Sequence, residues 1–387
     1  MKIFKLKDIS EFIRNGVTIK QDISSKEGIP ITRIETISKG TIDFNKLGYA
    51  NIFKIEKYKE WLLKKGDILI SHINSEKHLG KSAIYLDNNY DIIHGMNLLC
   101  IRAIDKKVFP EYLQLFFKTN QYKKQIKKIT KKSVNQASFS VNDFKEILIT
   151  VPDLNIQEKI IKKIKVLEKI LENNKLKLVY LSELTKSLFT RMFGDIKSND
   201  KNWKIYKFSE KLKISSGGTP SKANKIYWEN GTISWIGSNM CNDEIITKND
   251  GKFITEEGLK NSSAKIYKMN TVIVALVGAT IGKTGLLKFE TSTNQNIAAL
   301  EIKNMDYSPE FLFFLLQNLY YKFTELGGDT FKMANLSFIK NLPLISPPIE
   351  LQNKFAERIE KIEKLKFIFD KALISNIFGK LYKKVSA

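Results

Sequence analysis

Hydrophobic residues between 160 and 192 recur at alternating spacings of four and three positions over more than four heptads. This spacing places them on one face of a helix and is typical of a coiled-coil seam. A helix of about 35 residues extends for roughly 50 Å, which is longer than one small domain can cover. The members of the seam are Ile160, Ile164, Leu167, Leu171, Asn174, Leu178, Leu181, Thr185, Leu188 and Met192. Asn174 is expected to fix the register of the pair, as single buried asparagines do in coiled coils.

A second, shorter seam lies near the C-terminus and is interrupted by Lys366. Each seam follows a segment of mixed pattern, so the simplest arrangement pairs the two helices with each other. Antiparallel pairing would hold two domains apart at opposite ends. The residues of the second seam are Phe355, Ile359, Ile362, Phe369 and Leu373.

The remaining segments combine short β-type runs with turn residues. Runs 67–71 and 271–276 lie between Gly, Asn, Asp and Ser positions, as strands do. A helix is expected after Pro110 and after Pro309, because proline is tolerated in the first helical turn. The pattern therefore predicts mixed α/β (α+β) domains, each followed by a long helix.

The chain is an internal repeat of this unit. Four short motifs recur in the same order, between 195 and 204 residues apart. The first, before a strand, is Lys-Gly-Asp in one copy and Met-Asn-Thr in the other, and the second is Gly-Lys-Ser or Gly-Lys-Thr. The third is Pro-Glu-aromatic-Leu, and the fourth is a Pro-containing segment that ends in Gln157 or Gln352. Such repetition indicates one architectural unit used twice. The expected divisions are a first mixed domain, a first long helix, a second mixed domain and a second long helix, at residues 1–152, 153–196, 197–346 and 347–387.

The net charge of the chain limits the classes of function that are compatible with it. The 64 lysines and arginines exceed the 41 acidic residues, giving a net charge of +23. A surplus of this size points to a polyanionic partner, most often nucleic acid. Two distant cysteines and three histidines make zinc and disulfide scaffolds improbable. The absence of a long apolar run or a secretory signal predicts a soluble protein of a reducing compartment that does not contact membrane.

Candidate DNA contacts fall in two groups. Nine lysines and one acidic residue lie between 106 and 132, so this block is expected to contact phosphates, which fix register without reading sequence. Base reading needs Arg, Asn, Gln, Ser or Thr tips on loops that enter the major groove, and Arg33 stands out in a lysine-rich chain. The phosphate candidates are Lys123, Lys124, Lys127, Lys128, Lys131 and Lys132. The base-reading candidates are Arg33, His72, Asn74, Lys77, His78, Lys81, Asn135 and Gln136 in the first domain, with Ser238, Asn239, Thr280, Lys283, Lys332 and Asn335 in the second.

Two catalytic motifs are approached but not completed. Gly278 and Gly282 are separated by three residues, one fewer than a phosphate-binding P-loop requires. Pro347 and Pro348 precede Ile349, where an amino-methyltransferase needs an aromatic residue to stack on a flipped base. We interpret the first segment as a turn whose glycines relieve backbone strain and the second as a turn that leads into a helix. Trp235 is expected to pack in the core.

The sequence resembles the specificity subunit of type I restriction–modification systems. The segment Gly217-Gly218-Thr219-Pro220-Ser221, with Tyr227-Trp228 and 231–236, is similar to the opening of a recognition domain in that family. Residues 278–285 resemble its central strand-turn segment, 347–352 the lead into its conserved helix, and 187–194 the end of that helix. The N-terminal copy departs more, with Gly16-Val17-Thr18 in place of the Gly-Thr-Pro element.

The resemblance implies a division of labour. Each recognition domain would read one half of a bipartite target in double-stranded DNA, and the antiparallel coiled coil would set the spacer. The helices would dock two methyltransferase subunits, and restriction subunits would join them. The chain would have no catalytic residue, metal or cofactor of its own, with S-adenosylmethionine, ATP and Mg²⁺ only in the partners. The location would be the cytoplasm of a bacterium or archaeon. The helix-pair and docking positions are Ile164, Leu167, Leu171, Asn174, Leu178, Leu181, Ile359, Ile362, Phe369 and Leu373.

Two other function classes stay open from the residues. A stand-alone methyltransferase or nuclease would need a cofactor loop or an acidic metal cluster. An RNA-binding scaffold would show the same basic surplus and would be separated from a DNA reader by competition between duplex DNA and RNA.

Overall fold

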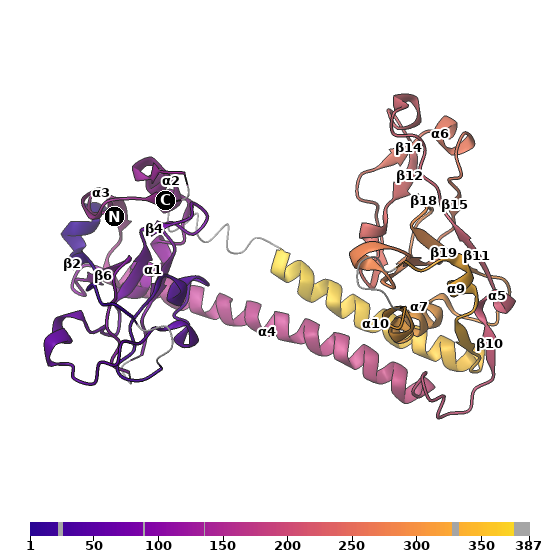
Figure 1. Cartoon of the computed structure of the whole chain (residues 1–387), viewed down its shortest axis with the longest axis horizontal. Helices are drawn as coiled ribbons and strands as arrows, with labels where there is room; N and C mark the ends of the chain where they lie inside the picture. The colour runs from indigo at the N-terminus through magenta and orange to yellow at the C-terminus, as the bar shows by residue number, and fades with distance from the viewer. Residues whose placement is uncertain (22–25, 88–89, 135, 327–332, 375–387) are drawn as a thin grey trace. The chain divides into compact units, whose positions relative to one another are not determined.

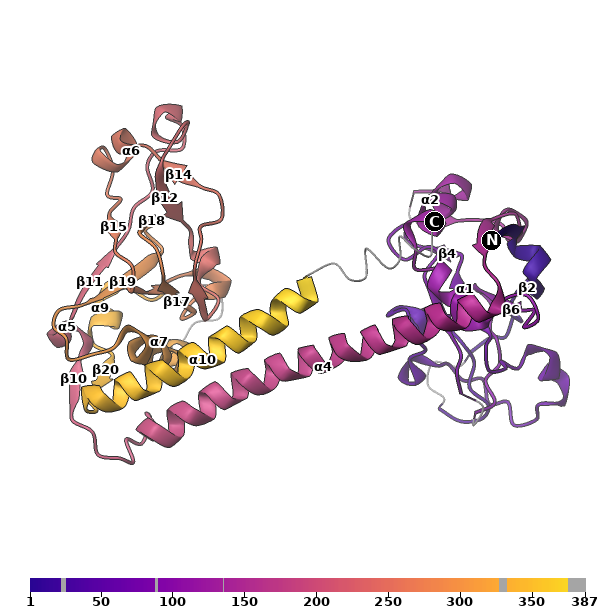
Figure 2. The same cartoon turned by 180° about the vertical axis from the view of Figure 1, so that it is seen from behind.

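The computed structural model describes residues 1–21, 26–87, 90–134, 136–326 and 333–374 of the chain. It divides into two compact units, the first built on Met1–Asn174 and the second on Lys175–Lys371. Figures 1 and 2 show that each unit combines a small mixed α/β body with helical segments of the long helices.

A four-stranded antiparallel sheet forms the centre of the first unit. Alternate residues of a strand point to opposite faces, so Ile68 and Ile70 join one apolar cluster and Leu69 joins another. Burial on both faces explains the uninterrupted apolar run of this strand, which the sequence pattern predicted correctly. The strand order is β2 (Ser10–Asn15), β6 (Leu98–Ala103), β3 (Ile68–Ser71) and β5 (Ser82–Ile84).

Smaller elements complete this unit. Strands β1 (Lys2–Lys5) and β9 (Leu148–Val151) pair antiparallel. A three-stranded sheet has the order β4 (Ile73–Asn74), β8 (Ala137–Ser138) and β7 (Lys131–Lys132). Its helices are α1 (Pro110–Phe116), α2 (Asn120–Ile129) and α3 (Val141–Lys145).

The second unit contains two larger sheets. The first has the order β11 (Leu212–Ser216), β19 (Ile297–Ile302), β16 (Val272–Ala275), β17 (Thr284–Leu287) and β13 (Glu244–Ile246). The second has the order β14 (Phe253–Ile254), β12 (Ile233–Ile236), β18 (Thr291–Thr293) and β15 (Ile266–Tyr267). Strands β10 (Ile205–Lys207) and β20 (Pro343–Ile345) pair separately. The short helices are α5 (Phe208–Lys211), α6 (Glu256–Lys260), α7 (Pro309–Asn318), α8 (Tyr320–Thr324) and α9 (Leu336–Lys340).

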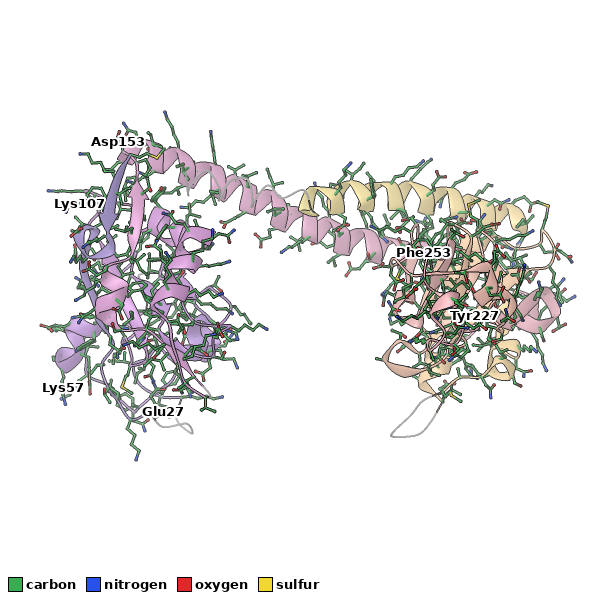
Figure 3. All side chains as sticks on the ribbon, turned by 90° about the horizontal axis from the view of Figure 1, so that it is seen from above. Glu27, Lys57, Lys107, Asp153, Tyr227 and Phe253 are labelled. Carbon is green, nitrogen blue, oxygen red and sulfur yellow. The ribbon has the colours of Figure 1, made fainter. Side chains whose placement is uncertain are left out.

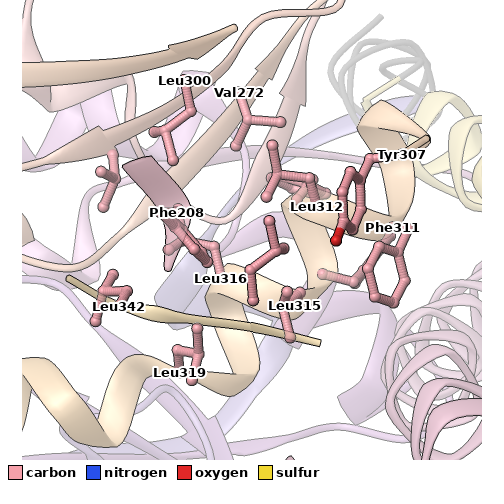
Figure 4. Packing of buried hydrophobic residues seen from close by; sticks show 14 of the residues in the cluster. Phe208, Val272, Leu300, Tyr307, Phe311, Leu312, Leu315, Leu316, Leu319 and Leu342 are labelled. Carbon is pink, nitrogen blue, oxygen red and sulfur yellow. The ribbon is translucent and has the colours of Figure 1, made fainter. Parts of the chain in front are cut away.

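The core of the second unit lies between α7 and the five-stranded sheet. Figure 4 shows Leu312 and Leu315 of α7 among Phe208, Val272 and Leu300, and all five side chains are fully buried or nearly so. Burying each such side chain stabilises the fold by roughly 1.5–3 kcal/mol. The proline at the first position of α7, like that of α1, occupies the place that the sequence predicted.

The internal repeat is confirmed element by element. The pair β1–β9 corresponds to β10–β20, since each joins the start of a unit to the strand before a long helix. Strand β3 lies between β6 and β5 as β16 lies between β19 and β17. The helix that follows the proline is α1 in one copy and α7 in the other.

The two long helices are α4 (Leu154–Phe193) and α10 (Ile349–Ile374). Every predicted seam position of α4 is buried or half-buried, while most of the other positions of the helix between them are exposed. Asn174 is 8% exposed and Thr185 is 2% exposed, so the polar seam positions are covered as well. The heptad pattern therefore identified the buried face of α4.

Within the second unit, the C-terminal part of α4 pairs antiparallel with α10. Arg358 Nη1 lies 3.7 Å from Met192 Sδ, and Lys177 Nζ lies 4.8 Å from the centre of the Phe369 ring. Residue numbers thus fall along one helix as they rise along the other, which confirms the predicted direction. Leu181, Ile359 and Ile362 belong to the same apolar surroundings.

Aromatic rings close this pairing at the end of α4. The Phe355 ring centre lies 5.5 Å from that of Phe189 and 5.3 Å from that of Phe193. Phe311 of α7 lies 4.7 Å from Phe193, so the helix pair and the domain core form one cluster. Gly194, at a φ of +83°, then ends the helix in a conformation that favours glycine.

One seam residue has a different role from that predicted. Ile164 is 2% exposed and packs with Ile161 in the core of the first unit. It was assigned to the helix pair, but here the seam of α4 first serves its own recognition domain. Leu373 lies in α10, and its side chain falls outside the described part of the structure.

A buried glutamine fixes the start of each long helix to the preceding domain. In the first unit, Gln157 Oε1 accepts a hydrogen bond from the Phe109 amide at 2.9 Å. Its Nε2 donates to the carbonyl oxygens of Lys107 at 3.1 Å and Pro152 at 2.8 Å. Figure 3 shows Lys107 and Asp153 at the same end of this unit, opposite Glu27 and Lys57.

The second unit repeats this arrangement atom for atom. Gln352 Oε1 accepts from the Ser308 amide at 2.9 Å. Its Nε2 donates to the carbonyl oxygens of Asp306 at 3.1 Å and Pro347 at 2.9 Å. Both glutamines are fully buried, so the hydrogen bonds have no competition from water.

Two histidines are buried in the first unit. His94 is 2% exposed, and its Nε2 lies 2.8 Å from the Leu98 carbonyl oxygen. His72 is 5% exposed and its ring lies 6.2 Å from that of Phe139. Burial lowers the pKa of each to about 4, so both rings are neutral in the fold. His72 therefore packs in the fold as a neutral side chain, and its assignment to DNA reading stays a prediction.

We predict that Gln157→Leu lowers the free energy of unfolding by about 3 kcal/mol, because one buried amide and two carbonyl groups lose their partner. Urea unfolding followed by circular dichroism measures the loss. Gln114→Leu is the matched control: Gln114 is also buried but makes only one hydrogen bond, of 3.3 Å to Ser82. Equal losses of unfolding free energy in the two variants would contradict the role of Gln157 in fixing the start of the helix.

The buried histidines predict an acid-sensitive first unit. The unfolded chain binds protons at His72 and His94 below a pH of about 6.5 and the folded chain does not, so the free energy of unfolding falls as the pH drops toward 4. Each histidine contributes at most about 1.4 kcal/mol per pH unit. Urea unfolding at pH 7 and pH 5 should show a smaller difference in the variant His72→Leu/His94→Gln. An equal difference in the variant and in the unaltered chain would contradict this prediction.

Candidate nucleic-acid interface

Three segments of the first unit meet around one cavity of about 660 Å³. They are residues 39–41 after a 3₁₀-helix, residues 76–82 between β4 and β5, and residues 117–132, which include α2. The floor is apolar, formed by Leu79, Phe117, Tyr122 and Ile126. The rim contains seven lysines and one acidic residue, namely Lys39, Lys77, Lys81, Lys118, Lys123, Lys127, Lys132 and Glu76.

Backbone geometry fixes the central turn of this cavity. The Gly80 amide donates to the Ser71 carbonyl oxygen at 2.7 Å, and Ser71 N donates to the carbonyl oxygen of Lys81 at 2.9 Å. Gly80 has a φ of +73°, which favours glycine. The Tyr122 hydroxyl of α2 donates to the Gly80 carbonyl oxygen at 3.1 Å, which fastens the turn to the helix.

Four of the rim lysines are engaged with the protein. Lys132 Nζ pairs with Glu76 at 2.9 Å, and Lys81 Nζ donates to the Ser38 carbonyl oxygen at 2.9 Å. Lys118 and Lys39 pair with Glu168 and Asp43, both at 3.4 Å. In the described part of the chain, the other three rim lysines have no carboxylate within 4 Å; they are Lys77, Lys123 and Lys127.

The second unit builds the same turn. Gly282 N donates to the Ala275 carbonyl oxygen at 2.9 Å, and Ala275 N donates to that of Lys283 at 2.9 Å. Gly282 has a φ of +77°, and Gly278 before it has a φ of +75°. A side chain on Gly282 would collide with the Phe323 ring of α8, which takes the place of Tyr122.

The two turns differ in charge. Lys283 Nζ pairs with the Asp243 carboxylate at 2.6 Å and lies 5.2 Å from the centre of the Tyr320 ring. Lys322 of α8 pairs with Glu325 at 3.2 Å. Both lysines of segments 277–284 and 320–326 are therefore neutralised, whereas α2 of the first unit carries four lysines and no acid.

The first base-reading candidates occupy corresponding places in the repeat. Arg33 precedes the 3₁₀-helix η2 (Ile34–Ile37), and Ser238 begins the 3₁₀-helix η6 (Ser238–Met240). The residues before each turn pair in parallel with an equivalent partner: Ile31 with Ile93, and Trp235 with Ser292. Arg33 is partly exposed, with its Nε 3.7 Å from Glu35.

Several candidate side chains use their polar atoms in hydrogen bonds within the protein. Asn74 Oδ1 accepts from Ser75 N at 2.7 Å, and its Nδ2 donates to Ser71 Oγ at 3.2 Å. Asn335 Oδ1 caps α9 by accepting from the Phe338 amide at 2.8 Å. Asn239 Nδ2 lies 3.4 Å from an Asp250 carboxylate oxygen. These side chains have local structural roles that the sequence alone did not reveal.

The other candidate residues are exposed, partly exposed or outside the described part of the chain. Asn135 and Lys332 fall outside the described residues. Lys131 lies on strand β7, and Ser133, Val134 and Gln136 line a smaller cavity of about 350 Å³. The remaining side chains are partly or fully exposed: Lys124, Lys128, Gln136, His78 and Thr280. Lys118 of the basic block belongs to the cavity, as does Lys39, which was not among the candidates because only folding brings segment 39–41 to α2.

The two motif-like segments have structural roles. The segment with Gly278 and Gly282 joins β16 to β17, which are antiparallel neighbours, so it is a hairpin connection and not a strand-to-helix phosphate loop. Pro347 and Pro348 lead directly into α10. Trp235 is 5% exposed, and its indole N–H donates to the Gly218 carbonyl oxygen at 3.0 Å, which confirms a core position.

Within the described residues, no group of three or more His, Cys, Asp or Glu side chains is placed to hold a metal ion. Among the helices that the structure describes, none has the length and apolar character to cross a membrane.

The chain is similar to known proteins over nearly all its length. The family model for the type I restriction modification DNA specificity domain matches it twice, over residues 1–180 and 200–377. A protein of Methanocaldococcus jannaschii, assigned as the specificity subunit of the MjaX type I restriction enzyme, is 30% identical over 385 residues, which cover 94% of this chain and 87% of that protein. The EcoR124I/EcoR124II specificity subunit of Escherichia coli is 26% identical over 183 residues, covering 44% of this chain and 42% of that protein.

Solved structures share the fold. The S subunit of a type I restriction–modification system from M. genitalium matches with a TM-score of 0.61 and 14% identity, covering 99% of this chain and 95% of that one. A chain from a type I R-M system studied for complex assembly matches with a TM-score of 0.55 and 15% identity, covering 99% and 96%. Since the family model covers both halves of the sequence, the chain belongs to the family of type I restriction–modification DNA specificity proteins.

Proposed function

We propose that this chain is the DNA-specificity subunit of a type I restriction–modification complex, in which each unit reads one half of a bipartite duplex target. The observation that carries the proposal is that both units build the same glycine turn. The Gly80 and Gly282 turns have the same hydrogen bonds, but the side chains around them differ. A shared frame with different side chains suits two domains that dock similarly on DNA and read different sequences.

The long helices supply the second part of the proposal. An antiparallel pair of fixed length would set the distance between the half-sites and offer a surface for partners. Exposed apolar residues of α4 lie on the side away from its seam: Leu176, Val179, Tyr180 and Leu184, between 47% and 62% exposed. Exposed apolar stripes of this kind mark protein interfaces. We assign this face to the methyltransferase subunits, two of which would bind, with restriction subunits joining the complex.

Chemistry would reside in the partners. In the proposed complex, S-adenosylmethionine, ATP and Mg²⁺ act only in the methyltransferase and restriction subunits. The hairpin geometry at Gly278 and the turn before α10 support this division, since neither segment forms a cofactor-binding loop.

The first unit would contribute more phosphate contacts than the second. Lys77, Lys123 and Lys127 lack carboxylate partners among the described residues, whereas Lys283 and Lys322 are paired. Each phosphate contact that displaces a counterion adds about 0.9 to the slope of log K against log salt concentration.

We predict that Lys77→Gln/Lys123→Gln/Lys127→Gln lowers this slope by about 2–3 and weakens binding to all duplex sequences alike. Fluorescence anisotropy of the assembled complex with specific and unrelated duplexes, over a range of salt, measures both effects. The matched control Lys54→Gln/Lys57→Gln/Lys59→Gln removes three exposed lysines outside the cavity. An unchanged slope in the cavity variant, or an equal change in the control, would remove the cavity from the DNA interface.

The test of the function as a whole is the methylation pattern. The chain is expressed with its methyltransferase subunit in a host that lacks other adenine methylation, and modified sites are mapped by sequencing. We expect two short motifs separated by an unread spacer. Exchanging residues 1–152 for another family member's domain should change one motif only. A single continuous motif, methylation by this chain alone, or preference for RNA over duplex DNA would contradict the proposal.

A further inference from the structure

A cationic pocket of about 710 Å³ lies in the second unit, where the last turn of α4 meets the first turns of α10. Two arginines and one lysine surround an apolar floor made by a tryptophan, a methionine and a leucine. The lining residues are Arg191, Met192, Lys201, Trp203, Leu351 and Arg358.

The two arginines of this pocket are unusual for the chain. It contains only five arginines among 64 basic residues, and Arg191 and Arg358 are two of them. Lysine serves as well as arginine for general positive charge, whereas only the planar guanidinium binds a carboxylate or phosphate through two parallel hydrogen bonds. Their concentration at one place therefore indicates directed recognition.

Neither guanidinium has a carboxylate partner within 4 Å among the described residues, and the one polar contact of Arg358 is with Met192 Sδ. The acidic groups of the neighbouring turn are engaged elsewhere. Asp195 Oδ1 accepts from the amide of Lys197 at 2.7 Å, and Asp200 Oδ1 accepts from the amide of Asp195 at 2.9 Å. Among the described residues, both guanidinium groups are thus left without an ion-pair partner within 4 Å.

The floor of the pocket is rigid and apolar. The Trp203 indole N–H donates to the Phe193 carbonyl oxygen at 2.8 Å, which fixes the ring beside the end of α4. Met192 and Leu351 pack against the core cluster of this unit. Tryptophan, methionine and arginine are the residue types enriched in protein–protein interfaces, and tryptophan and arginine dominate binding hot spots.

We propose that this pocket is a docking site for an acidic segment of a partner protein, in which a carboxylate binds between Arg191 and Arg358 and a neighbouring apolar side chain packs on Trp203. A phosphate backbone would use the guanidinium groups but has no apolar surface for the floor, so the mixed lining favours protein. The chain's own C-terminal residues 376–387 include Lys380, Lys383 and Lys384 and no acid, so their charge does not complement the pocket.

The docking site belongs to one half of the repeat. Arg358 lies six residues after Gln352, and the residue six positions after Gln157 is Lys163. The bidentate group is therefore present on α10 and absent from the corresponding position of α4. Two copies of one partner would consequently bind the two halves with different strength.

This inference rests on the proposed function, because it assumes assembly with other subunits. The probe is the methyltransferase subunit of the same system, purified and titrated against the full-length chain by isothermal calorimetry. We expect Arg191→Gln/Arg358→Gln to raise the dissociation constant at least about tenfold. Arg191→Lys/Arg358→Lys should give an intermediate dissociation constant, since the positive charge is kept but the planar group that forms two parallel hydrogen bonds is lost. Lys186→Gln/Lys361→Gln, on the same two helices outside the pocket, should bind as the unaltered chain does.

Three results separate the possibilities. Unchanged affinity in the arginine variant, with native circular dichroism, would overturn the docking site while leaving the proposed function intact. Unchanged assembly with weaker duplex binding and a smaller salt slope would assign the pocket to DNA phosphate instead. If the unaltered chain and the subunit form no complex, the proposed function itself fails, and with it the basis for this inference.

Discussion

The attachment of each long helix to its own domain is the constraint on which the rest of this protein depends. One buried glutamine side chain, Gln157 or Gln352, joins the first turn of the helix to the segment before it and to the loop before α1 or α7. Three hydrogen bonds in a dry site define both the position and the direction of the helix. A helix that could swing at this point would transmit no fixed distance to anything bound at its other end.

The repeat shows which parts of the unit are held constant and which are free to differ. The hydrogen bonds of the buried glutamine, those of the glycine turn and the order of four strands, β2-β6-β3-β5 and β11-β19-β16-β17, are the same in both copies. The side chains around the turn are different: in one copy three of the lysines have no carboxylate within 4 Å among the described residues, while in the other the lysines pair with Asp243 and Glu325. Backbone contacts preserve the frame because they do not depend on side-chain identity, so the exposed residues can change without disturbing it.

Prediction from the sequence succeeded where a pattern is local. The seam of α4, the strands at 68–71 and 272–275 and the helices after Pro110 and Pro309 follow from spacing and turn residues alone. The sequence did not reveal the structural roles of individual site residues. His72 is buried against Phe139, Asn335 caps α9, and Ile164 packs into a domain core, since each role depends on a neighbour that is distant in sequence or on an element boundary that the pattern does not mark.

By itself the sequence determined a repeated α/β unit, two long helices and a basic surface, because hydrophobic period, internal similarity and charge are properties of the chain. Only the tertiary structure decided which lysines share a cavity, which are neutralised and which arginines have no carboxylate nearby among the described residues. Lys39 and α2 line one cavity, and Arg191 and Arg358 line another, although many residues separate them in the sequence. The physical reason is that ion pairing and burial depend on distances in space, which the linear order of residues does not contain.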